Sequence, residues 1–430
     1  MNHKVSVDDV FGTARDLPKN YVIRKHVDDA FISALSKDTH VVVYGGSKQG
    51  KTSLRKKHLM SNDHVVITCS RSWEVSNIHE SLLKAAGYHI TASESLTTSG
   101  KSKVCLSLGP GDTDISNETV RQVNKKHLEL DIDSVNDVIR ALEEISFEKY
   151  IIIEEFHYLS EQTQIDFAHI LKAYHELSKH CFIIIGVWLE DDRLTAYNND
   201  LVGRVISVNA DTWLEEDIDE LLDTSESLLN IEFTQEFKSG IKKYCKDNVF
   251  LVQQICMKAC EAQGVHHTQP VKVTVAKTLD IYEEIKSTLS MQSGRYTKFL
   301  MAFGVGFQPT ELELYKWILA PLIDIDEAHL RDGLTAQAIR RYVEPKHPLG
   351  SQVSILKLSG ALNKCVALQQ EKNIRPIVIE YDTNRQRLKI VDKGFLLWRS
   401  FQDKNELFEL ADLSAELYLE SRSTQLGLQE

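Results

Sequence analysis

A glycine-rich segment at residues 45–52, GGSKQGKT, constrains the fold more than any other part of the chain. It matches the pattern G-x-x-x-x-G-K-[ST], and it lies between an apolar run, residues 40–44, and a helical pattern, residues 51–60. The backbone N–H groups of such a loop, together with the start of the following helix, bind phosphate. We therefore predict a nucleotide site here. Its predicted residues are Gly45, Gly46, Ser47, Lys48, Gln49, Gly50, Lys51, Thr52 and Ser53.

Two side chains of this motif have predicted roles toward ATP. Lys51 reaches the β- and γ-phosphates, and the hydroxyl of Thr52 is a ligand for Mg²⁺. A second run, YIIIEEFHYL at residues 150–159, places two carboxylates at the end of a buried strand. Because parallel sheets bind ligands at the carboxyl ends of their strands, we predict that Glu154 helps to hold Mg²⁺ through water and that Glu155 polarises the attacking water. A solvated strand end without chemistry is the alternative.

The apolar runs of the first 220 residues predict an α/β fold. They are continuous stretches of Val and Ile, typical of strands that are buried on both faces of a parallel sheet, and helical patterns lie between them. The predicted strands are residues 40–44, 64–69, 149–154, 182–187 and 205–208. Residues 91–130 interrupt this alternation with polar, turn-rich sequence, which predicts an insertion that carries a hairpin.

The rest of the chain predicts further domains. We expect a P-loop ATPase domain at residues 1–212, a helical lid at 213–293, a winged-helix domain at 294–402, and an acidic C-terminal helix and tail at 403–430. The winged helix is inferred from helical patterns that precede two strands, residues 375–381 and 387–391.

Charge and composition exclude several classes of protein. The chain has 62 acidic and 50 basic residues, a net charge of −12, which argues against a general nucleic-acid coat. Its apolar runs fall far short of the roughly 18 residues that a membrane span needs. The N-terminal sequence has no apolar signal core. Seven cysteines form no Cys-x-x-Cys pair, which favours a reducing cytoplasm.

The phosphate loop, the acidic strand end and the FIIIGVW strand together resemble AAA+ ATPases, in the branch that joins origin-recognition ATPases to STAND signalling ATPases. Residues 17–35 resemble the segment before the first strand of that branch, which implies that Tyr21, Val22 and Arg24 lie near the adenine. Residues 200–208, DLVGRVISV, resemble the arginine-finger segment, with Arg204 as the finger. Residues 248–255 resemble the lid helix. The resemblance implies ATP, Mg²⁺ and a homo-oligomer or a separate effector protein.

The chain also departs from that family. Glu154 stands where the family has Asp, residues 186–193 offer no clear polar sensor, and the lid lacks the arginine of the second sensor. We therefore predict a slow switch rather than a ring motor. Three roles stay open: a signalling or antiviral defence switch, a DNA-binding initiator or loader, and an adaptor that uses ATP as a structural ligand.

Residues 333–400 contain 12 basic and five acidic residues, a local charge of +7. On the predicted ribbon, Arg385, Arg387 and Lys389 alternate and would face DNA phosphates, while Leu388 and Ile390 pack inward. The alternative, which we slightly favour, is that these cations contact protein.

Overall fold

The computed structural model describes residues 4–12, 16–96, 102–108 and 128–414, and it divides into two compact units. We call them the sheet unit and the loop unit. The sheet unit comprises Lys25–Tyr44 and Leu54–Ala210, and the loop unit comprises Met1–Arg24, Gly45–Ser53 and Asp211–Glu430. The phosphate loop therefore belongs to the same unit as the C-terminal half of the chain. The domain boundaries expected from the sequence stay a prediction.

The sheet unit is built on a five-stranded parallel sheet with the order β2-β6-β7-β1-β8. All five predicted strands are present, and the predicted α/β class is confirmed. Their bounds are β1 His40–Tyr44, β2 His64–Thr68, β6 Tyr150–Glu154, β7 Phe182–Ile185 and β8 Val205–Asn209.

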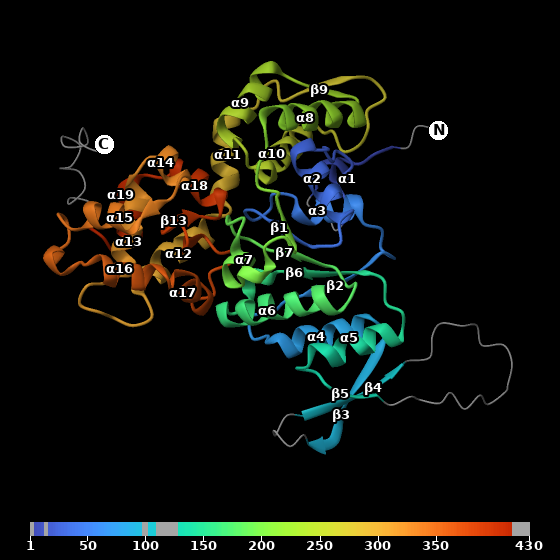
Figure 1. The fold of residues 1–430 in the computed structure, drawn as a ribbon. Coiled ribbons are helices and arrows are strands. Elements are labelled where there is room, and N and C mark those ends of the chain that lie inside the picture. The colour runs from blue at the N-terminus through green and yellow to red at the C-terminus, as the bar shows by residue number, and fades with distance from the viewer. Residues whose placement is uncertain (1–3, 13–15, 97–101, 109–127, 415–430) are drawn as a thin grey trace. The chain divides into compact units, whose positions relative to one another are not determined.

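Side chains that alternate along each strand form a separate core on each face of the sheet. Ile151 and Ile153 face one core, and Ile152 faces the other. The first core is covered by α4 Val75–Ala85, α5 Val135–Glu144 and α6 Glu161–Leu177, which Figure 1 shows on one side of the strands. Residues of α2 Lys25–Leu35 and α3 Lys51–His58 form the second core. Burial on both faces explains why the strands are continuously apolar.

The predicted insertion contains a three-stranded antiparallel sheet rather than a single hairpin. Its strands are β3 Tyr88–Leu96, β4 Ser102–Leu108 and β5 Leu128–Asp131, in the order β3-β4-β5. The middle of the insertion, residues 109–127, lies outside the described residues. The shorter elements of the sheet unit are η1 Phe156–Tyr158, α7 Arg193–Tyr197 and η2 Asn199–Leu201.

The first part of the loop unit is helical, as expected, but it also contains a short strand pair. Strands β9 and β10 are parallel and only three residues each, too short to give an alternating sequence pattern. The elements are α1 Val7–Phe11, α8 Glu215–Leu229, β9 Ile231–Phe233, α9 Gln235–Cys245, α10 Val249–Ala262, β10 Val273–Val275 and α11 Ile281–Ser290.

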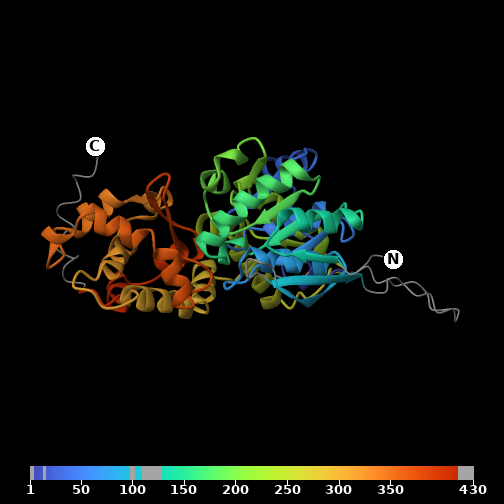
Figure 2. The same cartoon turned by 60° about the horizontal axis from the view of Figure 1, so that its bottom comes forward.

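Residues 293–414 form helices and a small antiparallel sheet of order β11-β13-β12. Figures 1 and 2 show these helices, coloured tan to red, gathered together. The helices are α12 Ser293–Val305, α13 Leu314–Asp324, α14 Glu327–Arg331, α15 Ala336–Val343, η3 Gly350–Gln352, α16 Ile355–Leu362, α17 Cys365–Glu371, α18 Lys393–Ser400 and α19 Lys404–Leu410. The strands are β11 Leu334–Thr335, β12 Ile379–Asp382 and β13 Arg387–Ile390. The winged-helix assignment stays a prediction.

Two helical patterns of the sequence differ in the structure. The pattern at residues 351–370 is divided into η3, α16 and α17. The acidic helix expected within residues 403–430 is α19, which ends at Leu410; residues 415–430 lie outside the described residues. None of the described helices is both long enough and apolar enough to cross a bilayer.

Candidate functional site

The phosphate loop turns sharply because three of its residues have positive φ. The φ angles are 143° at Gly45, 62° at Lys48 and 89° at Gly50. Gly46 is required for a different reason: a Cβ atom there would lie 2.8 Å from Oδ1 of Asp211 and 2.9 Å from the carbonyl oxygen of Val391. The backbone thus favours glycine at positions 45, 46 and 50, because a side chain there would strain or displace the loop, whereas Lys48 adopts its positive φ with a side chain.

Lys51 and Thr52 lie at the start of α3, where the predicted phosphate and metal contacts would form. Lys51 is 8% exposed, and its ammonium group donates to the carbonyl oxygens of Gly45 at 2.9 Å and Gly46 at 2.6 Å. Thr52 is exposed in the first turn of α3, a turn that contains no acidic residue. A helix start with a buried ammonium group and an accessible hydroxyl fits a phosphate with its cation.

A chain of polar contacts, which we call the loop clasp, ties the phosphate loop to distant parts of the loop unit. The N–H of Gly46 donates to Oδ1 of Asp211 at 2.7 Å. The ammonium group of Lys393, at the start of α18, lies 3.0 Å from Oδ2 of Asp211 and 2.5 Å from Oδ2 of Asp247. Burial opposes the charge of Asp247, but Lys393 and Arg331 outweigh it, so its pKa lies below the usual value.

Sequence reasoning missed this clasp. Asp211 and Lys393 are 182 positions apart, and neither belongs to a recognisable motif. No local pattern could have paired them.

The three residues expected near the adenine differ in burial and in their contacts. Val22 is 2% exposed and belongs to the apolar core of the loop unit. Arg24 is also buried, but it lies 4.3 Å from the ring centre of Trp213 and donates to the carbonyl of Thr212. The indole of Trp213 in turn donates to the carbonyl oxygen of Gln49 at 3.3 Å. Arg24 and Trp213 thus lie against the phosphate loop; Tyr21 is half-buried.

The two candidate carboxylates at the end of β6 have different surroundings. Glu154 forms an ion pair with Arg55 of α3 at 3.1 Å. Glu155 is 45% exposed and has a φ of 59°. Oε2 of Glu155 lies 3.6 Å from Nε2 of His157. The side chain of His157 is buried. Nδ1 of His157 accepts the N–H of Val187 at 3.2 Å, so the ring proton of neutral His157 is on Nε2, facing Glu155.

Arg204 lies at the amino ends of the parallel strands, whereas Glu154 lies at their carboxyl ends. Arg204 directly precedes β8, and its carbonyl accepts the N–H of His40, the first residue of β1. Its guanidinium contacts Glu176 at 2.9 Å and the carbonyl of Asp200. Because Glu154 is at a carboxyl end, Arg204 can serve such a site only in another copy of the chain.

The predicted ribbon is β12 and β13, and its cations are partly neutralised. Leu388 and Ile390 are buried, as expected. Arg387 donates to the carbonyl of Gly333, and Lys389 lies 3.3 Å from the buried carboxylate of Asp382. Arg385 lies in the turn between β12 and β13 rather than on a strand. Its backbone N–H donates to the carboxylate of Asp382. The predicted alternation therefore holds for two of the three cations.

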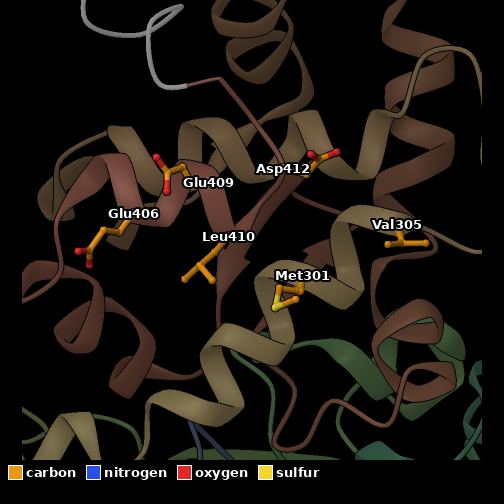
Figure 3. Close-up of a pocket in the computed structure, with 6 residues that line it drawn as sticks. All are labelled: Met301, Val305, Glu406, Glu409, Leu410 and Asp412. Atoms are coloured by element: carbon orange, nitrogen blue, oxygen red, sulfur yellow. The ribbon is translucent and has the colours of Figure 1, made fainter.

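The described residues contain a surface pocket of about 630 Å³ between α12 and α19. Figure 3 shows Met301 and Leu410 opposite each other, with acidic side chains near them. None of the sequence-predicted site residues lines it. Within the described ranges, no group of three or more His, Cys, Asp or Glu side chains could hold a metal. The metal roles of Thr52 and Glu154 stay predictions.

No protein-family model matches the chain, and no curated protein matches its sequence. Solved structures do. A Walker-type ATPase of Pyrococcus abyssi is 12% identical with a TM-score of 0.50, over 91% of this chain and 99% of that one. The ORC2 protein of Aeropyrum pernix is 13% identical with a TM-score of 0.45, over 94% and 98%.

A STAND protein of Pyrococcus horikoshii with a tetratricopeptide repeat sensor is 15% identical with a TM-score of 0.37, over 94% of this chain and 46% of that one. The likeness to the Pyrococcus abyssi protein concerns the fold alone. The chain has the fold of a Walker-type ATPase, and the P-loop ATPase fold predicted from its sequence is confirmed.

Proposed function

We propose that the protein is an ATP-binding, slowly hydrolysing molecular switch. The observation that carries the proposal is the loop clasp: the phosphate loop is hydrogen-bonded to Asp211, which is paired with Lys393 of α18. A ligand that moves Gly46 must therefore change contacts of residues far away in the chain. Nucleotide binding shifts such an equilibrium by as much as its affinities for the two arrangements differ.

The residues around the loop have complementary roles in this proposal. Backbone N–H groups and Lys51 bind the phosphates, and Arg24 lies near the base. Bound Mg²⁺ would be held by Thr52 and, through water, by Glu154, and it would neutralise phosphate charge. Glu155 accepts the proton of the attacking water, and the Nε2–H of His157 orients its carboxylate. The segment without a clear sensor residue favours slow turnover.

The position of Arg204 supports a proposal about assembly. Because it lies at the amino edge of its own sheet, we propose that it completes the site of a neighbouring copy. A homo-oligomer is therefore the primary partner, and a separate effector protein is the alternative. A role in signalling or antiviral defence in the cytoplasm rests only on the resemblance to STAND ATPases.

Calorimetric titration with ATP tests the binding proposal. Lys51→Ala should weaken ATP binding about 100-fold, because it removes the ammonium group from the phosphates. Lys56→Ala, at an exposed position of the same helix, is the matched control and should bind normally. Equal affinity in wild type and Lys51→Ala would overturn the site.

Light scattering with and without ATP tests the switch and its assembly. We expect a nucleotide-dependent change in mass or hydrodynamic radius. ATP that binds without turnover or any such change would support the adaptor alternative, with ATP as a structural ligand.

DNA binding through residues 333–400 is the second candidate function, favoured by their charge of +7. Binding should be weak, and its logarithm should fall with log salt by about 0.9 per phosphate neutralised. The triple change Arg385→Glu, Arg387→Glu and Lys389→Glu should abolish it, whereas a control with Lys56→Glu and Lys57→Glu should not. Absence of binding to duplex and single-stranded DNA at low salt would assign these cations to protein contacts.

A further inference from the structure

One ion pair of the sheet unit joins the helix that follows the phosphate loop to the acidic end of β6. Nε of Arg55 lies 3.1 Å from Oε1 of Glu154, and the two side chains are 9% and 19% exposed. Arg55 is three positions after Thr52 and is therefore one helical turn away on the same helix. The carboxylate that suits a metal thus already has a cationic partner.

A third residue fixes the guanidinium of Arg55. Its Nη1 lies 2.9 Å from Nε2 of His64, the first residue of β2. Because a guanidinium has only donors, Nε2 of His64 must be the acceptor and carries no proton. Arg55 is therefore held from both sides, by a carboxylate and by an imidazole, and cannot rotate away without losing both contacts.

We propose that Arg55 is the positioning residue of Glu154 and that its guanidinium competes with Mg²⁺ for this carboxylate. The inference rests on the proposed nucleotide site and adds its metal dependence. The two atoms are within ion-pair distance although they form no hydrogen bond, and an ion pair this little exposed is screened less by solvent and salt than one at the surface. Mg²⁺ gives up its water reluctantly, and it must displace this pair before Glu154 can coordinate it directly. In the wild type, Mg²⁺ therefore adds little to ATP affinity through Glu154.

The measurement is the ratio of ATP dissociation constants in EDTA and in Mg²⁺, obtained by calorimetry on the full chain. We expect a ratio within about 3-fold for wild type and at least about 10-fold for Arg55→Met, in which Glu154 is released. Arg55→Lys keeps the positive charge and should give a ratio close to wild type. The double variant Arg55→Met with Glu154→Gln should return to the wild-type ratio, because position 154 then has no carboxylate that Mg²⁺ could contact.

The single variant Glu154→Gln provides a test in which Arg55 is intact. Its ratio should change by less than about 3-fold, whereas the same substitution added to Arg55→Met should remove most of the at least about 10-fold effect; an equal loss on both backgrounds would overturn the inference. Thermal unfolding of the four combinations at these two positions should show non-additive shifts, which measure their coupling.

The outcomes distinguish the competition at Glu154 from the proposed nucleotide site. ATP binding with the same ratio in wild type and Arg55→Met overturns the competition and leaves the nucleotide site standing. No ATP binding in either buffer overturns the proposed function, and this inference with it. If Arg55→Met fails to fold, Arg55→Gln takes its place, because it also removes the positive charge from Glu154; a wild-type ratio in Arg55→Gln would overturn the competition.

Discussion

The sheet unit and the loop unit are organised by different forces. In the sheet unit, apolar strands bury both faces against helices, and the candidate catalytic carboxylates simply follow the end of β6. In the loop unit, the phosphate loop is fixed by charged side chains from distant segments, Asp211 and Lys393. The candidate carboxylates are therefore placed by local sequence, whereas the contacts that hold the phosphate loop come from distant parts of the chain.

The two units also differ in the titratable groups that they bury. In the sheet unit, burial lowers the pKa of His40 to about 4 and also lowers those of His79 and His180. In the loop unit, the pKa values of Asp247 and Glu327 are lowered, because basic partners outweigh the effect of burial. Buried neutral histidines weaken a fold in mild acid, and paired carboxylates weaken it only in strong acid.

The largest expected effect separates chemistry in the sheet unit from binding in the loop unit. Glu155→Gln should lower ATP turnover by about 10²–10⁴-fold, because the amide cannot accept the proton of water. ATP affinity should stay within a few-fold. Steady-state phosphate release and calorimetry measure the two quantities. If Glu154→Gln lost turnover and Glu155→Gln did not, Glu154 would be the residue that activates water, and Glu155 would not.

The second expected effect tests the acid response of the sheet unit. His40 donates to the carbonyl of Leu171 and accepts the N–H of Phe182, so the native state needs its neutral form. Its pKa is about 4 against an unperturbed 6.5. Unfolded chains take up the proton first, so stability falls as pH is lowered from 6.5 to 4, by about 3 kcal/mol.

Urea unfolding across this pH range gives the slope. His40→Gln can donate and accept but does not titrate, and its slope should be smaller by about one proton. If the pH dependence of the unfolding free energy is the same in His40→Gln as in wild type, His40 does not cause the acid sensitivity of the sheet unit. The carboxylates of the loop unit should lose their contribution only as pH falls below their unperturbed values near 4.

The smallest effect tests the loop clasp. Lys393→Met leaves Asp211 and Asp247 without this ammonium group, and it should reduce the free energy of unfolding by about 1–3 kcal/mol. Lys372→Met, which alters only a long surface pair with Glu371, should cost less than about 0.5 kcal/mol. Hydrogen exchange of Gly46 should rise in Lys393→Met but not in the control. Equal exchange in both would show that Lys393 does not stabilise the loop.

Local patterns predicted the parts of the molecule that depend on neighbours in sequence. The phosphate loop, the five parallel strands and the position of Glu154 follow from glycine spacing and apolar runs. Other features depend on the packed fold. Arg55 contacts Glu154 only because α3 lies beside β6 in the fold, and Asp211 meets Gly46 across 165 positions of the chain. Val22 is buried in the apolar core of the loop unit, and its predicted contact with the adenine stays a prediction.

The location of Arg204 restricts the symmetry of any assembly that uses it. Its position before β8 and that of Glu154 at the end of β6 are opposite edges of one parallel sheet. A neighbour that inserts this arginine therefore presents one surface and meets a different one. Such a contact is heterologous, so it cannot be satisfied by a twofold dimer. Repetition of the contact closes a ring if the rotation between copies divides a full turn, and otherwise extends a helical filament.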